Sequence, residues 1–329
     1  MPTKHKFPRK HRKQTRKITE PQVPAKNQMN CNPIVAGAKA SPNTCYTMEM
    51  LELIRASYNK NHLPSDYIPW SNPDEIWQTL NRRLVNCEKE DCWLAEIKDA
   101  ELRKQIDTLI FAPDQPAEWK TNKNEWLTDL DIRKVMHQYE QAYPNFKFIG
   151  PSPINYDTMV PASELYTYKG PPSDKKICVW EELCHIDIAS LLAEKIDKIG
   201  MVFNLDRHDM PGSHWVSLFV CLDKAHPFVF YFDSGGKSPP PEIKRLMKTI
   251  KTQGIKAGLA MKSHTNTNRQ HQKGNTECGM YSLFFNITML TGDSGFEQNM
   301  PMQKRIMLFK AANIPDKYVE NYRSTYYNK

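Results

Sequence analysis

The sequence contains no apolar run approaching the twenty residues that a membrane-spanning helix needs. Its mean hydropathy is also negative, at −0.65. The basic N-terminal region is not followed by an apolar segment, so a secretory signal is not expected. We therefore expect a protein that neither spans a membrane nor is secreted.

The eight cysteines form no zinc-binding pattern. Neither Cys87 and Cys92 nor Cys178 and Cys184 have the two-residue separation of a zinc knuckle. His185 beside Cys184 does not complete a ligand set, so no metal and no organic cofactor are expected. Because no secretory signal is visible, we expect a reducing compartment and free thiols.

Acidic residues are nearly absent from the first thirty positions. This segment has nine Lys or Arg against the single acid Glu20, whereas the rest of the chain carries thirty-six residues of each sign. A segment so charged and so poor in apolar residues does not fold alone. It can contact nucleic acid, serve as a nuclear-import signal, or remain a solvated arm. The candidate contact residues are Lys4, Lys6, Arg9, Lys10, Arg12, Lys13, Arg16 and Lys17.

The length of 329 residues allows two domains, and the sequence pattern changes along the chain accordingly. Residues 1–44 are predicted to be a basic disordered tail and linker. Residues 45–115 show three helical patterns and are predicted to form a helical arm domain. A stretch rich in Pro, Asn and Lys separates this arm from a core predicted over residues 124–329.

Strand-like runs gather in the middle of this core. Residues 201–205, 215–222 and 228–232 follow one another closely, and the last two runs are nearly all apolar, as in central strands. The distribution predicts an α+β fold with a central mixed sheet and flanking helices. Further short strands are predicted at residues 146–149, 154–156 and 255–262, and core helices at 126–143, 187–197, 242–252 and 302–326.

Cys278 stands at the start of a helix that is hydrophobic nearly all round, over residues 280–290. The unpaired N–H groups and the dipole at a helix N-terminus stabilise a thiolate, so this cysteine can act as a nucleophile. The polar loop of residues 266–277 can leave this end open to a substrate, and Gly279 leaves the backbone beside the sulfur uncrowded. The alternative is a buried cysteine that only packs.

A cysteine nucleophile needs a base and a group that orients the base. His214 lies at the start of the first long apolar strand, and Asp233 lies just past the end of the next one. A short connection at residues 223–227 makes these two strands antiparallel neighbours, which places both side chains at the same end of the sheet. Each residue alone can be explained by ordinary packing or by a turn. The order in which they occur along the chain is a more specific signal of catalysis.

An oxyanion formed during acyl transfer also needs hydrogen-bond donors. The backbone N–H of Cys278 is one natural donor. The side-chain amide of Gln272 can supply another, and Gln270 is the competing choice. Spacing alone does not separate the two glutamines.

Taken together, His214-Trp215, Asp233 after an apolar strand, and Gln272 six residues before Cys278-Gly279 resemble the SUMO/ubiquitin-like-protein protease superfamily, which includes the adenovirus protease. The resemblance covers roughly residues 124–295. It implies a papain-like, adenovirus-protease-like cysteine protease core. In such a core His214 would be the general base, Asp233 its orienting partner, Cys278 the nucleophile and Gln272 an oxyanion-hole donor.

Features of the arm and of the core entry are similar to a narrower group, the virion-maturation polyprotein proteases of nucleocytoplasmic large DNA viruses, of the African swine fever virus type. The segments concerned are Cys45-Tyr-Thr, the Cys87/Cys92-Trp93-Leu pair and residues 136–155. This resemblance implies cleavage of viral core or capsid polyproteins after Gly-Gly or Ala-Gly sites during particle maturation. It also implies action in the virion and in the host cytoplasm, at the viral factory.

Trp215 directly follows the proposed base, so its ring is expected to roof the substrate channel and exclude large side chains next to the scissile bond. The alternative is that Trp215 only packs in the core. Two other functions stay open: a protease that removes host ubiquitin-like modifiers, and an inactive structural or nucleic-acid-binding virion protein on the same fold.

Overall fold

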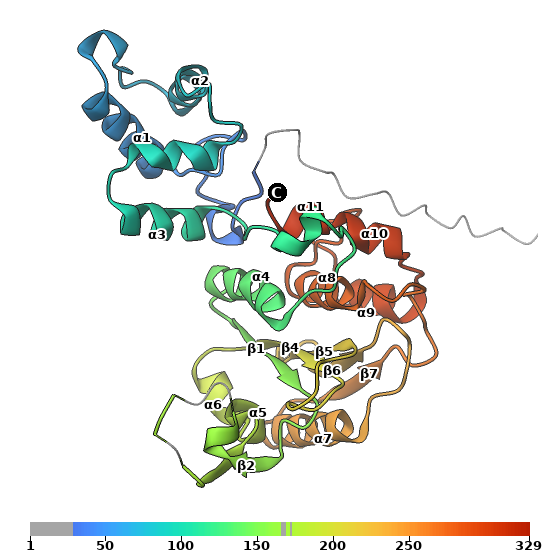
Figure 1. The fold of residues 1–329 in the computed structure, drawn as a ribbon. Coiled ribbons are helices and arrows are strands. Elements are labelled where there is room, and N and C mark those ends of the chain that lie inside the picture. Colours follow the sequence, from blue (N-terminus) through green and yellow to red (C-terminus); the bar gives the residue numbers. More distant parts are fainter. Residues whose placement is uncertain (1–28, 166–168, 172) are drawn as a thin grey trace, which may run out of the picture.

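The computed structural model describes residues 29–165, 169–171 and 173–329. A group of helices at the N-terminal end of the described chain forms an arm, and a larger domain contains a sheet with helices on both faces (Figure 1). The basic residues between positions 4 and 17 lie outside the described part, so their contact with nucleic acid stays a prediction. Within the described residues, no helix has the length and apolarity that a bilayer crossing requires.

Side-chain caps start the three long helices of the arm. Thr47 accepts a hydrogen bond from the backbone N–H of Met50, and Asn72 and Asp99 cap the next two helices in the same way. Thr, Asn and Asp are residue types that favour the N-cap position, and the three helical patterns predicted for residues 45–115 are present. The arm elements are α1 (Met48–Asn61), α2 (Pro73–Arg83) and α3 (Ala100–Ile110), with the 3-10 helices η1 (Pro33–Val35), η2 (Pro64–Asp66) and η3 (Glu90–Glu96).

Residues 29–44 belong to the arm, so the expectation of a disordered linker was wrong for this part of the tail. Met29 and Val35 are buried in the arm's hydrophobic core. The backbone N–H of Asn32 donates to the carbonyl of Ile110 at 2.9 Å. The segment has no helical or strand period, because it is held by individual hydrogen bonds and a disulfide, and composition alone therefore suggested a linker.

Six of the eight cysteines are joined in disulfides, whereas Cys221 and Cys278 are free. The expectation of free thiols was therefore wrong for these six, and the inference of a reducing compartment from them loses its basis. Spacing does not reveal which cysteines a fold brings within bonding distance. The pairs are Cys31–Cys45, Cys87–Cys92 and Cys178–Cys184.

A mixed five-stranded sheet forms the centre of the larger domain, in the order β1-β4-β5-β6-β7. The middle pairs β4–β5 and β5–β6 are antiparallel, and the outer pairs β1–β4 and β6–β7 are parallel. A separate two-stranded sheet pairs β2 with β3. The strands are β1 (Phe146–Pro153), β2 (Met159–Pro161), β3 (Lys176–Cys178), β4 (Lys198–Asn204), β5 (Trp215–Cys221), β6 (Phe228–Phe232) and β7 (Lys262–Thr265).

Helices cover both faces of this sheet, which confirms the predicted α+β class (Figure 1). Along β5, Trp215, Phe219 and Cys221 pack on the face of α4 and α8, whereas alternate residues such as Leu218 pack on the face of α6 and α7. Every residue of β5 is buried, as its continuous apolar run indicated. The helices are α4 (Asp129–Ala142), α5 (Glu181–Cys184), α6 (Ile188–Ala193), α7 (Pro241–Lys256), α8 (Cys278–Thr291), α9 (Met302–Ala311), α10 (Asp316–Asn321), α11 (Arg323–Tyr326), η4 (Ala117–Lys120) and η5 (Ala162–Glu164).

Two short predicted strands are absent from the described fold. Ile154 and Tyr156 lie in a turn and are buried in the core cluster on the α7 face. The run from Ile255 onward belongs first to the end of α7, and the strand begins only at Lys262. Short apolar runs do not distinguish a strand from a buried turn or a helix end, because they span too little of either period.

A buried ion pair fixes the start of α8. Glu277, the residue before Cys278, accepts hydrogen bonds from the guanidinium of Arg323 at 3.1 and 3.2 Å. The two side chains are only 5% and 8% exposed. Arg323 also stacks over the ring of Trp119 at 4.4 Å and donates to the carbonyl of Glu125 at 2.9 Å. The last turn of the chain thus holds the helix that carries Cys278.

We expect Arg323→Ala to lower the free energy of unfolding by about 3–5 kcal/mol, because it leaves the buried Glu277 carboxylate without its cationic partner, with the hydroxyl of Thr276 still donating at 3.1 Å. Urea unfolding followed by circular dichroism measures this change. Lys304→Ala is the control: it breaks the exposed Lys304–Glu297 pair and should cost less than about 1 kcal/mol. Equal stability of the two variants would show that the buried pair does not hold the start of α8.

Candidate active site

Cys278 is the first residue of α8 and is 2% exposed. All residues of this helix from Cys278 to Leu290 are buried, which explains why its sequence is apolar all round. Gly279 is required by packing, since a Cβ there would lie 2.9 Å from Cβ of Leu127 and 3.3 Å from Cδ1 of Trp215. The helix N-terminus that presents the sulfur is therefore pressed against these two side chains.

His214 and Asp233 meet at one end of the sheet, as predicted from the two apolar strands. His214 immediately precedes β5 and Asp233 immediately follows β6, and the antiparallel register pairs Ser217 with Phe232. Nε2 of His214 and Oδ1 of Asp233 are 2.7 Å apart. The carboxylate also accepts backbone N–H groups from Gly235 at 2.8 Å and Lys237 at 3.0 Å. Asp233 is 1% exposed, so these bonds satisfy a charge that is shielded from water.

The electrostatics of the pair favour a protonated imidazole. Burial by itself lowers the pKa of His214, but the hydrogen bonds and charges of Asp233 and Cys278 outweigh it and raise that pKa to about 9. For Asp233, burial raises the pKa, but the hydrogen bond and charge of His214 and the two backbone N–H donors lower it below its usual range. The site therefore supports an ionised carboxylate beside an imidazolium.

The two ring nitrogens of His214 have different partners. Because Nε2 faces Asp233, Nδ1 is the atom left for the thiol of Cys278, whose hydrogen bond helps to raise the pKa of the ring. Such an arrangement can move a proton from the sulfur to the imidazole and later to a leaving group. The structure thus brings together the three predicted residues Cys278, His214 and Asp233.

Gln272 lies in the loop between β7 and α8 and is 5% exposed. Its Oε1 accepts a hydrogen bond from the hydroxyl of Ser234 at 2.6 Å, which leaves the Nε2 group as the donor for a substrate oxygen. Nε2 of Gln270 instead donates to the backbone carbonyl of Gln272 at 2.8 Å. These contacts favour Gln272 over Gln270 as the predicted oxyanion donor.

Two supporting residues were missed by the sequence analysis. Asn266, 1% exposed, accepts from the backbone N–H of Asp233 at 2.9 Å and donates to its carbonyl at 2.6 Å. Ser234 holds Gln272 through both its hydroxyl and its carbonyl. Ser234 sits directly beside Asp233 in the sequence and could have been singled out, whereas Asn266 looked like any polar loop residue.

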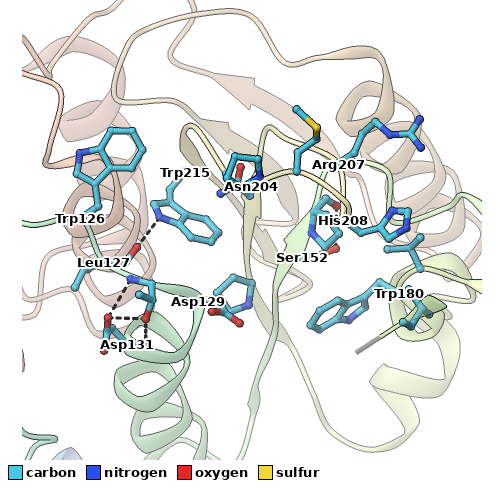
Figure 2. Close-up of a pocket in the computed structure, with 18 of the residues that line it drawn as sticks. Trp126, Leu127, Asp129, Asp131, Ser152, Trp180, Asn204, Arg207, His208 and Trp215 are labelled. Atoms are coloured by element: carbon cyan, nitrogen blue, oxygen red, sulfur yellow. Dashed lines mark hydrogen bonds between the residues drawn. The ribbon is translucent and has the colours of Figure 1, made fainter. Parts of the chain in front are cut away.

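Trp215 lines a cleft of about 620 Å³. Figure 2 shows Trp126 and Trp215 on one side of this cleft and Trp180, Arg207 and His208 on the opposite side. The indole Nε1 of Trp215 donates to the carbonyl of Leu127 at 3.0 Å, which fixes the ring against the segment just before α4. Trp215 thus lines this cleft, and its role at a substrate channel stays a prediction.

One group of side chains in the described part of the chain could hold a metal ion, and it contains none of these residues. It consists of Cys178, Cys184 and His185.

Part of the chain matches a known family model. Residues 186–327 match the family model described as "Ulp1 protease family, C-terminal catalytic domain". This range includes His214, Asp233, Gln272 and Cys278.

Two viral proteins are similar in sequence. A protein of Acanthamoeba polyphaga mimivirus that is named as a thiol protease is 29% identical over 273 residues, or 76% of this chain and 82% of that protein. A cysteine protease of African swine fever virus is 29% identical over 213 residues, or 62% and 73% of the two chains. The crystal structure of an African swine fever virus protease matches 92% of this chain and 97% of its own with a TM-score of 0.59, at 19% identity, so the two share the fold of arm and core.

Proposed function

We propose that this chain, a cysteine peptidase that carries a catalytic domain of the Ulp1 protease family, is a viral endopeptidase that cuts virion precursor polyproteins after Gly-Gly or Ala-Gly pairs. The observation that carries the chemistry is the contact of His214 with Asp233 on one side and with the thiol of Cys278 on the other. The observation that supports small residues before the scissile bond is the place of Trp215, which lines the cleft and packs against Gly279 beside Cys278.

In the proposed reaction, Sγ of Cys278 attacks the scissile carbonyl carbon while its proton is held by Nδ1 of His214. Asp233 orients the ring through Nε2 and stabilises its positive charge. The backbone N–H of Cys278 and the Nε2 group of Gln272 donate to the oxyanion, and each such donor typically contributes about 3 kcal/mol.

The intermediate then collapses in two balanced steps. The C–N bond breaks as His214 gives its proton to the leaving amine, which leaves a thioester on Cys278. A water molecule next attacks the thioester and gives a proton to His214, which releases the carboxylic acid product and restores the Cys278 thiolate beside the His214 imidazolium. No other group is needed to accept or supply the protons.

The small-residue channel predicts that a Gly-Gly-X peptide is cleaved with a kcat/KM about 10-fold or more above that of the matching Ala-Ala-X peptide, because added methyl groups collide beside the indole. Trp215→Ala should reduce this ratio towards one. Kinetics on the two peptides measure the effect, and Trp126→Ala, at the more exposed rim, serves as the control that keeps the preference. Equal cleavage of both peptides by the wild type would contradict the channel.

The same assay separates a polyprotein protease from one that acts on ubiquitin-like modifiers. Efficient cleavage of short peptides supports a polyprotein substrate. Activity only on a folded modifier fused to a leaving group would instead indicate a protease of ubiquitin-like modifiers.

The proposal includes the virion and the host cytoplasm as the place of action. Contact of the basic residues 4–17 with nucleic acid belongs to the proposal as well, and deletion of residues 1–28, which leaves the described arm intact, should remove the salt-sensitive part of any DNA binding.

A further inference from the structure

A single turn of chain beside the substrate cleft collects two sulfurs and an imidazole. Cys178 ends β3, α5 follows after two residues, and His185 comes directly after the last residue of α5, Cys184. The N–H groups of Cys184 and His185 donate to the carbonyls of Trp180 and Glu181, each at 3.0 Å. This turn brings one ligand atom from each of Cys178, Cys184 and His185 within 4.8 Å of one another.

We propose that these three side chains bind a zinc ion when the Cys178–Cys184 disulfide is reduced. Two thiolates and an imidazole are a ligand set that zinc prefers, with sulfur at about 2.3 Å and nitrogen at about 2.0 Å from the metal. Donors within 4.8 Å need only small side-chain movements to reach these distances. His185 is 70% exposed, so water can occupy the fourth position of a tetrahedral site.

Glu181 is placed to orient the imidazole. Its Oε2 lies 3.8 Å from Nε2 of His185, and its Oε1 accepts the backbone N–H of Cys178 at 3.3 Å. Carboxylates that hold a metal-ligating histidine through its second nitrogen are common around zinc and raise its affinity. One carboxylate therefore connects the residue that begins the turn with the histidine that ends it.

The disulfide and the metal are alternative uses of the same two sulfurs. A dithiol supplies two electrons and two protons to open the disulfide, whereas a phosphine supplies the two electrons and water supplies the two protons and the oxygen of the phosphine oxide. Zinc then displaces both thiol protons as two Zn–S bonds form. The disulfide and the bound zinc ion each keep the turn between the two cysteines compact. That turn contains Val179 and Trp180, which both line the cleft. Figure 2 shows Trp180 opposite Trp215, so the site would set one wall of the cleft.

The experiment uses the full-length Cys278→Ala protein, so that the catalytic thiol contributes no zinc binding and no peptidase activity is required. After reduction with a phosphine, zinc loading and exhaustive dialysis, elemental analysis should find one zinc per chain, and none in the oxidised protein. Loading with Co²⁺ should give a thiolate-to-cobalt charge-transfer band. Glu181→Gln should weaken zinc binding by about 10–100-fold.

Cys184→Ser and His185→Ala should lose the zinc and the cobalt band, while Cys87→Ser, from a cysteine pair outside this cluster, should retain both. No zinc in the reduced protein, or zinc retained by His185→Ala, would overturn the site. A thiol count that shows the disulfide resisting reduction would also overturn it. Because all measurements are made on a protein without its nucleophile, they are independent of the proposed polyprotein cleavage.

Discussion

Replacement of Cys278 by alanine should lower kcat for peptide cleavage by about 10⁶-fold, the loss typical of removing a catalytic nucleophile. The substitution removes one sulfur from the start of α8 and leaves the ion pair of Glu277 with Arg323 in place, so the fold should survive. Hydrolysis of a Gly-Gly-X peptide, measured with circular dichroism on the same sample, separates loss of chemistry from loss of structure.

Cys221 provides the matched control for this experiment, because it is the second free cysteine among the described residues and is equally buried. It lies at the end of β5, and burial raises the pKa of its thiol. Cys221→Ala should therefore keep its activity, and iodoacetamide should label Cys278 but not Cys221. Activity of Cys278→Ala within about 100-fold of the wild type would assign the nucleophile elsewhere.

The residues with the clearest sequence signals were placed correctly because each stands at the edge of a long periodic element. The apolar runs of β5 and β6 fixed the hairpin that brings His214 to Asp233, and the all-round apolar pattern of α8 fixed the position of Cys278. These elements bury nearly every side chain, so their composition and length identify them as strands or helix with little ambiguity.

Contacts between segments far apart in the sequence were not predictable in this way. Asn266 supports Asp233 from 33 residues away, and Arg323 reaches Glu277 across 46 residues. The cysteine pairs likewise depend on where the loops fold back. Such contacts leave no period in the sequence, since they depend on the three-dimensional path of loops and chain ends.

Replacement of His214 by alanine should lower kcat/KM by about 10⁴-fold, because the protein loses both the base that takes the thiol proton and the acid that serves the leaving amine. In the wild type, activity should fall as the pH rises through about 9, the pKa of His214, because the imidazolium then loses its proton. This decrease is the high-pH limb of the profile of kcat/KM against pH, which measures it. The rate of alkylation of Cys278 over the same pH range reports directly on the reactivity of its thiol.

Asp233→Asn tests the origin of that limb. The carboxylate raises the pKa of His214, so a neutral amide should lower that pKa and move the loss of activity to a lower pH. Asp223→Asn makes the same change of charge at the opposite end of the β5–β6 hairpin, where the side chain bonds only the local turn, and should leave the profile unmoved. If both variants keep the limb near pH 9, the titrating group is not the His214–Asp233 pair, and the orienting role of Asp233 is wrong.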